Sequence, residues 1–245
     1  MQSSAFLIAV FEFVLLIFSL SFHECAHAWM ASRLGDQTAR LQGRVTLNPM
    51  YHVDPIGTLL FPALVIFGPF IGFHLPLMLV GWAKPTPVIT RNFRKIVRDD
   101  NLVSLAGPAS NLLLAVVATV VLLVFARLIP GGATAALQSF LLSVGEDTSA
   151  GAHPVAVLAS LAIVINLSLL FFNLLPIPPL DGSRVVRNLL PYNAATAYDR
   201  VSGWISYLLM IFVGGYVLNL AVSPLLGFVF RLLLRMQPAQ QMILQ

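Results

Sequence analysis

A long apolar run over residues 5–22 is the feature that most constrains how this chain can fold. About 18 apolar residues are enough to cross the hydrocarbon core of a bilayer as a helix. Similar runs recur along the 245 residues, of which 58% are hydrophobic and only 10% charged. Soluble domains carry about 25% charged residues. The sequence therefore predicts an integral membrane protein with helical spans.

The far end of this first run carries His23, Glu24 and His27. Residues four apart lie on one face of a helix, so both histidines can present a ring nitrogen to one metal ion. Glu24, one step round the helix, is placed to hold or deprotonate a water at the metal. The alternative is a solvated helix end without metal. Ionisable groups at membrane depth are costly and usually functional, which favours a zinc site.

A third ligand is expected, because catalytic zinc usually has three protein ligands and one open position. Residues 154–175 predict a helix that ends in a proline-rich turn, and Asp181 and Gly182 follow this turn. Alone, Asp181 would be interpreted as the N-cap of a short helix over residues 183–190. Beside an incomplete two-histidine site, its rigid position favours Asp181 as the third ligand.

The other apolar stretches complete an all-α polytopic fold. We expect a bundle of about four to five transmembrane helices in a single membrane-embedded domain, residues 1–245, that contains the zinc motif. Clear spans are predicted at residues 5–31, 102–129 and 154–175, and residues 201–235 predict one span plus an interfacial piece.

For each of three segments between these spans, the sequence predicts a different conformation. Residues 58–80 are long enough to cross, but repeated prolines and glycines indicate a broken or re-entrant segment. Residues 81–88 are predicted to be a short extended, β-like element, because their paired prolines disfavour helix. Residues 130–152 are expected to form an exposed linker.

The basic residues predict an orientation. If Asp181 joins His27 at one metal, their spans must end in the same leaflet, which requires an odd number of crossings between them. Residues 102–129 supply one crossing, so residues 58–80 should enter and leave by the same face. Most basic residues then lie on the side of the metal site, which the positive-inside rule assigns to the cytoplasm.

Charge and cysteine content narrow the functional classes. The net charge of +4 comes from 14 basic and 10 acidic residues. No basic face interleaves with exposed aromatics, so we expect contact with the lipid bilayer and no nucleic-acid partner. The single cysteine, Cys25, excludes an intramolecular disulfide.

Three motifs stand out together: His23-Glu24-x-x-His27, Ala106-Gly107-Pro108-x-x-Asn111 and Asn173-x-x-Pro176-x-Pro178-x-x-Asp181-Gly182. In combination they resemble the site-2 protease family of intramembrane zinc metalloproteases, most closely its short prokaryotic members without a PDZ or CBS domain. The resemblance implies that His23, His27 and Asp181 hold one Zn²⁺ per chain. It implies that Glu24 is the general acid/base.

Further residues are candidates for supporting the substrate or the site: Asn173, Asn111, Gly81, Trp82 and Lys84. The resemblance implies that Asn173 is a polar helper near the substrate or the site. Residues 81–88 resemble the family's extended element that is thought to receive the unwound substrate. Asn111 is expected either to hydrogen-bond across helices in plain packing or to act at the site.

The predicted function is hydrolysis of peptide bonds in or near transmembrane helices of membrane-protein substrates, as in regulated intramembrane proteolysis in a prokaryotic cell membrane. The partner is then a transmembrane segment of the substrate. The alternatives are a zinc-binding membrane transporter and a catalytically inactive helix-binding scaffold. A transporter has no need of Glu24 beside the first histidine, and the sequence shows no inverted repeat. An inactive relative is disfavoured because all four core residues are present.

Overall fold

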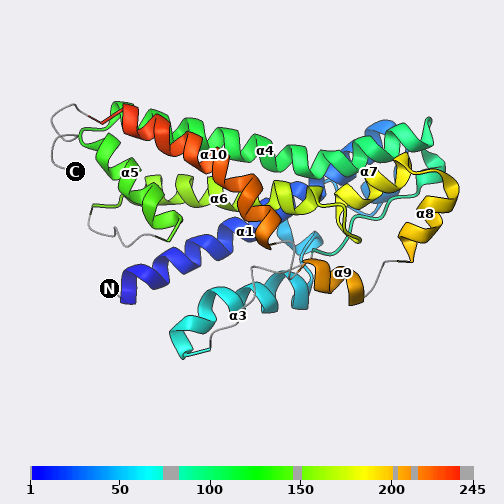
Figure 1. Ribbon diagram of the computed structural model, residues 1–245, viewed down its shortest axis with the longest axis horizontal. Coiled ribbons are helices and arrows are strands. Elements are labelled where there is room, and N and C mark those ends of the chain that lie inside the picture. The colour runs from blue at the N-terminus through cyan, green and yellow to red at the C-terminus, as the bar shows by residue number, and fades with distance from the viewer. Residues whose placement is uncertain (1, 74–82, 146–150, 201–203, 211–214, 238–245) are drawn as a thin grey trace.

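A computed structural model of the protein describes residues 2–73, 83–145, 151–200, 204–210 and 215–237 (Figure 1). Every regular element in these residues is helical, and they contain no strand. Four helices in the described chain are long and apolar enough to cross a membrane: α1 (Gln2–Leu34), α4 (Ile96–Leu128), α6 (Pro154–Leu174) and α10 (Gly215–Arg235). The predicted all-α polytopic fold is confirmed.

Shorter elements join the long helices: α2 (Thr38–Leu41), η1 (Pro49–Tyr51), η2 (Pro55–Leu60), α3 (Phe61–Phe67), η3 (Gly68–Ile71), η4 (Thr90–Asn92), α5 (Gly132–Ser143), α7 (Asp181–Leu189), α8 (Tyr192–Asp199) and α9 (Trp204–Leu209). Helix α5 contradicts the expected exposed linker at residues 130–152. Its Leu137 and Phe140 side chains are buried in the main core, so this segment has an apolar face that needs a partner.

The core of the bundle lies between α4, α5, α6 and α10, which run side by side in Figure 1. Its largest fully buried side chains are Leu122, Phe140, Ile163 and Leu233. Helix α1 packs on α6 through a second cluster around Leu16 and Leu161. In a bilayer such helices associate through close packing and hydrogen bonds, because lipid tails are as apolar as the side chains.

The described part of the segment between α1 and α4 is broken, as its prolines predict; residues 74–80 of the predicted re-entrant segment lie outside the described residues. Its apolar part, Pro55–Ile71, divides into the π-helical turn η2, α3 and η3. Phe67 packs against Phe6 near the start of α1, with tilted rings whose centroids are 5.8 Å apart. Yet the Lys84 amide donates a 2.8 Å hydrogen bond to the His52 carbonyl, so both ends of the segment meet at one end of the molecule. This is the arrangement expected of a segment that enters and leaves by the same face.

Residues 83–89 form an extended stretch, here called the arm. Besides the Lys84–His52 bond, the arm is fixed at its far end by a 2.7 Å hydrogen bond from the Ile89 amide to Oδ2 of Asp36. The arm contains Pro85 and Pro87, which fix φ and hold the preceding residues extended. The arm is therefore extended, but it does not pair with another strand within the described residues.

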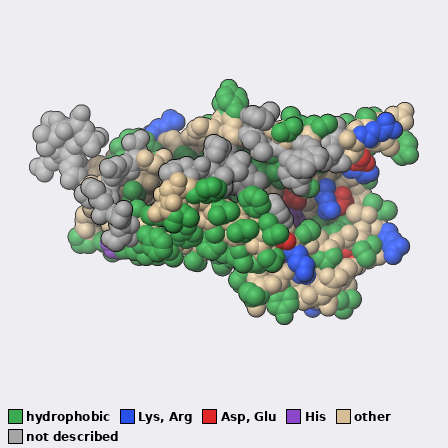
Figure 2. Space-filling model, turned by 90° about the horizontal axis from the view of Figure 1, so that it is seen from below, with side chains coloured by type: hydrophobic (Ala, Val, Ile, Leu, Met, Phe, Trp, Pro, Cys, Tyr) green, Lys and Arg blue, Asp and Glu red, His purple; other side chains and the backbone are tan. Residues whose placement is uncertain are grey.

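Charged side chains gather at the end of the molecule that carries α7 and α8, on the right of Figure 2. Apolar side chains cover much of the other part of this face. The same end holds the arm and the last turns of α1, so the charge asymmetry agrees with the predicted grouping of basic loops.

Candidate active site

Helices α1 and α7 bring together the three predicted metal ligands. His23 and His27 lie one turn apart on α1, and their Nε2 atoms are 3.0 Å from each other. Oδ2 of Asp181, the first residue of α7, lies 3.1 Å from Nε2 of His23 and 3.2 Å from Nε2 of His27. Within the described residues, no other three His, Cys, Asp or Glu side chains converge in this way.

These atoms fit the ligand set of a catalytic zinc. Zinc binds histidine nitrogen and carboxylate oxygen at about 2.0–2.2 Å in a tetrahedron, so ideal ligand atoms lie about 3.3 Å apart. The observed separations are close to that spacing. His23 and His27 are 4% and 7% exposed. A bound cation would offset the repulsion between the lone pairs that these buried side chains direct at one point.

Helix α4 orients both histidine rings. Nδ1 of His27 lies 2.7 Å from the backbone carbonyl oxygen of Val103, which can only accept, so Nδ1 carries the proton and Nε2 the lone pair. Nδ1 of His23 lies 2.9 Å from Oδ1 of the buried Asn111. The same tautomer follows for His23 with this amide orientation. Such outer partners fix ring orientation and raise ligand basicity in metal sites.

Gly107 leaves the space that the two rings occupy. A Cβ atom at this position would lie 2.4 Å from Nε2 of His27 and 2.5 Å from Nε2 of His23. Any side chain would therefore displace the ligand atoms or push α4 away from α1. The close approach of α4 at this glycine is therefore to the predicted ligand atoms themselves.

A rigid turn presents Asp181. The turn follows α6, and its Leu175, Ile177 and Leu180 side chains are buried in a cluster with Met210. The Asp181 carboxylate faces the histidines and does not cap α7, so the N-cap alternative is excluded.

Glu24 lies beside the ligand group and contacts the arm. Its Oε2 accepts hydrogen bonds from the backbone amide of Thr86 at 3.0 Å and from the Thr86 hydroxyl at 2.8 Å. The hydroxyl also lies 3.1 Å from the Glu24 carbonyl oxygen. The arm is thus joined directly to the predicted general acid/base.

The remaining predicted site residues fall in three places. The Asn173 amide donates to the Leu169 carbonyl one turn back on α6, at 2.9 Å, so this bond ties it to its own helix. The Lys84 side chain is exposed and its backbone joins the arm to His52. Gly81 and Trp82 lie outside the described residues. Thr86 was missed, although an isolated threonine between two prolines was the available signal.

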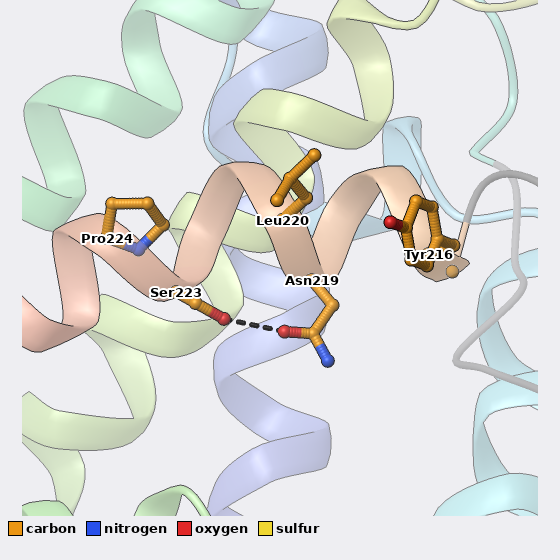
Figure 3. A pocket seen from close by; sticks show the side chains of 6 residues that line it. Tyr216, Asn219, Leu220, Ser223 and Pro224 are labelled. Carbon is orange, nitrogen blue, oxygen red and sulfur yellow. Dashed lines mark hydrogen bonds between the residues drawn. The ribbon is translucent and has the colours of Figure 1, made fainter.

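A hollow on the outer face of α10 lies apart from this chemistry (Figure 3). It is lined by Gly215, Tyr216, Asn219, Leu220, Ser223 and Pro224. None of these is a His, Cys, Asp or Glu, and the Ser223 hydroxyl is already bonded to Oδ1 of Asn219 at 2.6 Å. The hollow therefore offers no metal-ligand set.

Known proteins match most of the chain. A model described as Peptidase family M50 matches residues 11–215, which include all three predicted ligands and Glu24. The Bacillus subtilis protein named "Putative zinc metalloprotease YwhC" is 38% identical over 209 residues, which are 84% of this chain and 82% of that protein.

A more distant relative from Mycolicibacterium smegmatis is named "Putative zinc metalloprotease Rip2". It is 34% identical over 166 residues, which are 68% of this chain and 52% of that protein, so the match spans about half of its length. No solved structure matches the chain at a significant level. The family model and the first relative each cover more than four-fifths of the chain. The chain therefore belongs to peptidase family M50, the site-2 protease family that its motifs resemble.

Proposed function

We propose that this chain is an intramembrane zinc metalloprotease that hydrolyses a peptide bond in or near a transmembrane helix of a membrane-protein substrate. The observation that carries the proposal is the convergence of Nε2 of His23, Nε2 of His27 and Oδ2 of Asp181 within hydrogen-bond distance of one another. Glu24, the residue between the histidines in this motif, supplies a carboxylate beside them. One Zn²⁺ per chain fits this single ligand set.

Each residue then has a defined chemical task. Zinc, when bound, polarises a carbonyl and lowers the pKa of its water to about 7. Glu24 accepts a proton from the water that attacks the peptide carbonyl carbon, and passes it to the leaving amine as the C–N bond breaks. Asn111 and the Val103 carbonyl keep the rings oriented throughout.

The substrate must unwind before it can be cut, because helical amides are bonded and packed. The arm is the proposed docking place for the unwound chain, since it is extended and touches Glu24. Three of its N–H groups are already bonded within the protein, those of Lys84, Thr86 and Ile89. A substrate chain would therefore bond mainly to arm carbonyls. The charge asymmetry in Figure 2 supports an active site toward the cytoplasmic side of a prokaryotic membrane.

The decisive test is incubation of the detergent-purified protein with a generic single-span substrate. We expect cleavage that stops when a zinc chelator is added and returns with zinc. Glu24→Gln should keep zinc but lose cleavage, because the amide has similar size and cannot accept the proton. Cleavage by Glu24→Gln at near wild-type rate would refute the proposed mechanism. Zinc binding without cleavage of any span would favour the transporter alternative.

Metal analysis tests the ligand set separately. Asp181→Ala should lose most of its zinc, because two histidines alone leave the site incomplete. Asp199→Ala is the matched control, since this carboxylate only pairs with Arg187 on the surface at 2.8 Å. Full zinc occupancy in Asp181→Ala would show that the third ligand has been wrongly assigned.

A further inference from the structure

The contact between the arm and Glu24 involves more than packing. Two donors of one residue, the amide and the hydroxyl of Thr86, converge on a single carboxylate oxygen, Oε2 of Glu24. Among the described residues no other hydrogen bond reaches the Glu24 carboxylate, so none of these residues donates to Oε1. Hydrogen bonds to an ionised acceptor are about twice as strong as neutral ones.

The backbone on either side of Thr86 is fixed before it meets Glu24. Pro87 restricts Thr86 to extended conformations, and Pro85 does the same to Lys84. Hydrogen bonds to His52 and Asp36 hold the two ends of the arm. Thr86 therefore presents its donors in a preset direction, with little entropy left to lose.

We propose that Thr86 is a positioning residue for Glu24, holding Oε2 so that Oε1 is presented to the reacting water. This inference rests on the proposed proteolytic function. A general base must lie within about 2.6–3.2 Å of the proton it takes, and small misplacements lower the rate strongly. Thr86 also joins the base to the arm, so the element proposed to receive the substrate sets the position of the base.

The kinetic test compares a substitution that removes the Thr86 hydroxyl with one that keeps it. Thr86→Val keeps the side-chain shape and the backbone amide but removes the hydroxyl. We expect kcat to fall about tenfold or more, with KM within about twofold and zinc content unchanged. Thr86→Ser should recover kcat to within about threefold of wild type. Thr90→Val, an exposed threonine four residues along the chain, should behave as wild type.

The other outcomes would overturn the proposal in distinct ways. An unchanged kcat in Thr86→Val would show that the hydroxyl does not position the base. A raised KM with unchanged kcat would make Thr86 a substrate-binding residue. Loss of zinc, or failure of Thr86→Ser to recover activity, would make its role structural.

A measurement without catalysis separates this proposal from the proposed function. Hydrogen–deuterium exchange of the zinc-free protein reports the Thr86 amide directly, because Pro85 and Pro87 have no N–H. Glu24→Ala should make the Thr86 amide exchange about tenfold faster. Glu12→Ala removes another carboxylate of α1, and should leave that exchange unchanged. Equal exchange in Glu24→Ala and wild type would refute the contact, whether or not the protein cleaves any substrate.

Discussion

Oδ1 of Asn111 lies 2.9 Å from Nδ1 of His23, and the Asn111 side chain is completely buried. The two residues come from different long helices, α4 and α1, so this bond sets the rotation of one helix against the other. It also fixes which ring nitrogen of His23 faces the metal site. The Val103 carbonyl does the same for His27, one helical turn away on α1.

Asn111→Ala should weaken zinc binding about 10- to 100-fold, because the His23 ring loses the acceptor that fixes its tautomer and orientation. Competition with a chelator of known affinity measures the change. Asn173→Ala is the control, since its amide bonds to its own helix, and its zinc affinity should stay within about twofold of wild type. Equal affinities for both variants and wild type would contradict the orienting role of Asn111.

Gly107→Ala should abolish stoichiometric zinc binding, because its Cβ would lie 2.4 Å from Nε2 of His27. Overpacking of this kind also costs about 1–3 kcal/mol of stability. Metal analysis and thermal unfolding in detergent measure the two effects. Gly227→Ala on α10 has its nearest neighbour at 3.9 Å and should keep both zinc and stability. A Gly107→Ala protein with full zinc would mean that α4 lies farther from the ligands.

The Asp36 carboxylate anchors the arm, and we expect this anchoring to weaken in acid. Burial raises the pKa of this carboxyl, but hydrogen bonds from Ile89, Thr38 and Asn92 outweigh burial and lower the pKa below its usual value. The pKa of Asp36 in the folded protein is thus below its unfolded value of about 3.9. The ionised carboxylate therefore stabilises the folded protein fully above about pH 4, and this stabilisation is lost as the pH falls further.

The Asp36→Asn variant should therefore be less stable than wild type at pH 7, by about 1–3 kcal/mol. This difference in stability between Asp36→Asn and wild type should become smaller as the pH falls below about 4. Thermal unfolding of both zinc-free proteins at pH 7 and pH 3.5 excludes the acid release of zinc, and the other titrating groups are common to the two proteins. A difference that does not depend on pH would contradict a role for the ionised carboxylate.

Local rules predicted the parts of the site that depend on local geometry. Helical spacing alone places His23 and His27 on one face, and the prolines before Asp181 make its turn rigid. The roles of Gly107 and Thr86 depend on which surfaces meet in the folded chain. No spacing rule states that the α4 backbone faces the histidine rings, or that the arm crosses α1 at Glu24.

Helix α5 shows the limit of composition as a guide to fold. Its glycine, alanine and serine content suggested an exposed linker, yet small residues also suit close helix packing in membranes. Ala136 and Phe140 lie on the face that packs into the core between α4 and α6. The prediction was based on the average polarity of the segment. In the structure, the spacing of the few large apolar residues places them on one buried face of a helix.

The expected same-face arrangement of residues 58–80, of which residues 74–80 lie outside the described residues, predicts a labelling pattern. In a Cys25→Ala background, single cysteines at the exposed positions Gln42 and Arg91 should react with an impermeant reagent from the same side of the membrane. The hydrogen bond from the Lys84 amide to the His52 carbonyl joins the chain on the two sides of this segment and supports the expectation. A cysteine at Arg127, near the far end of α4, should react from the opposite side. Labelling of Gln42 and Arg91 from opposite sides would separate Asp181 from the histidines by about 30 Å of hydrocarbon, and a shared zinc would then be impossible.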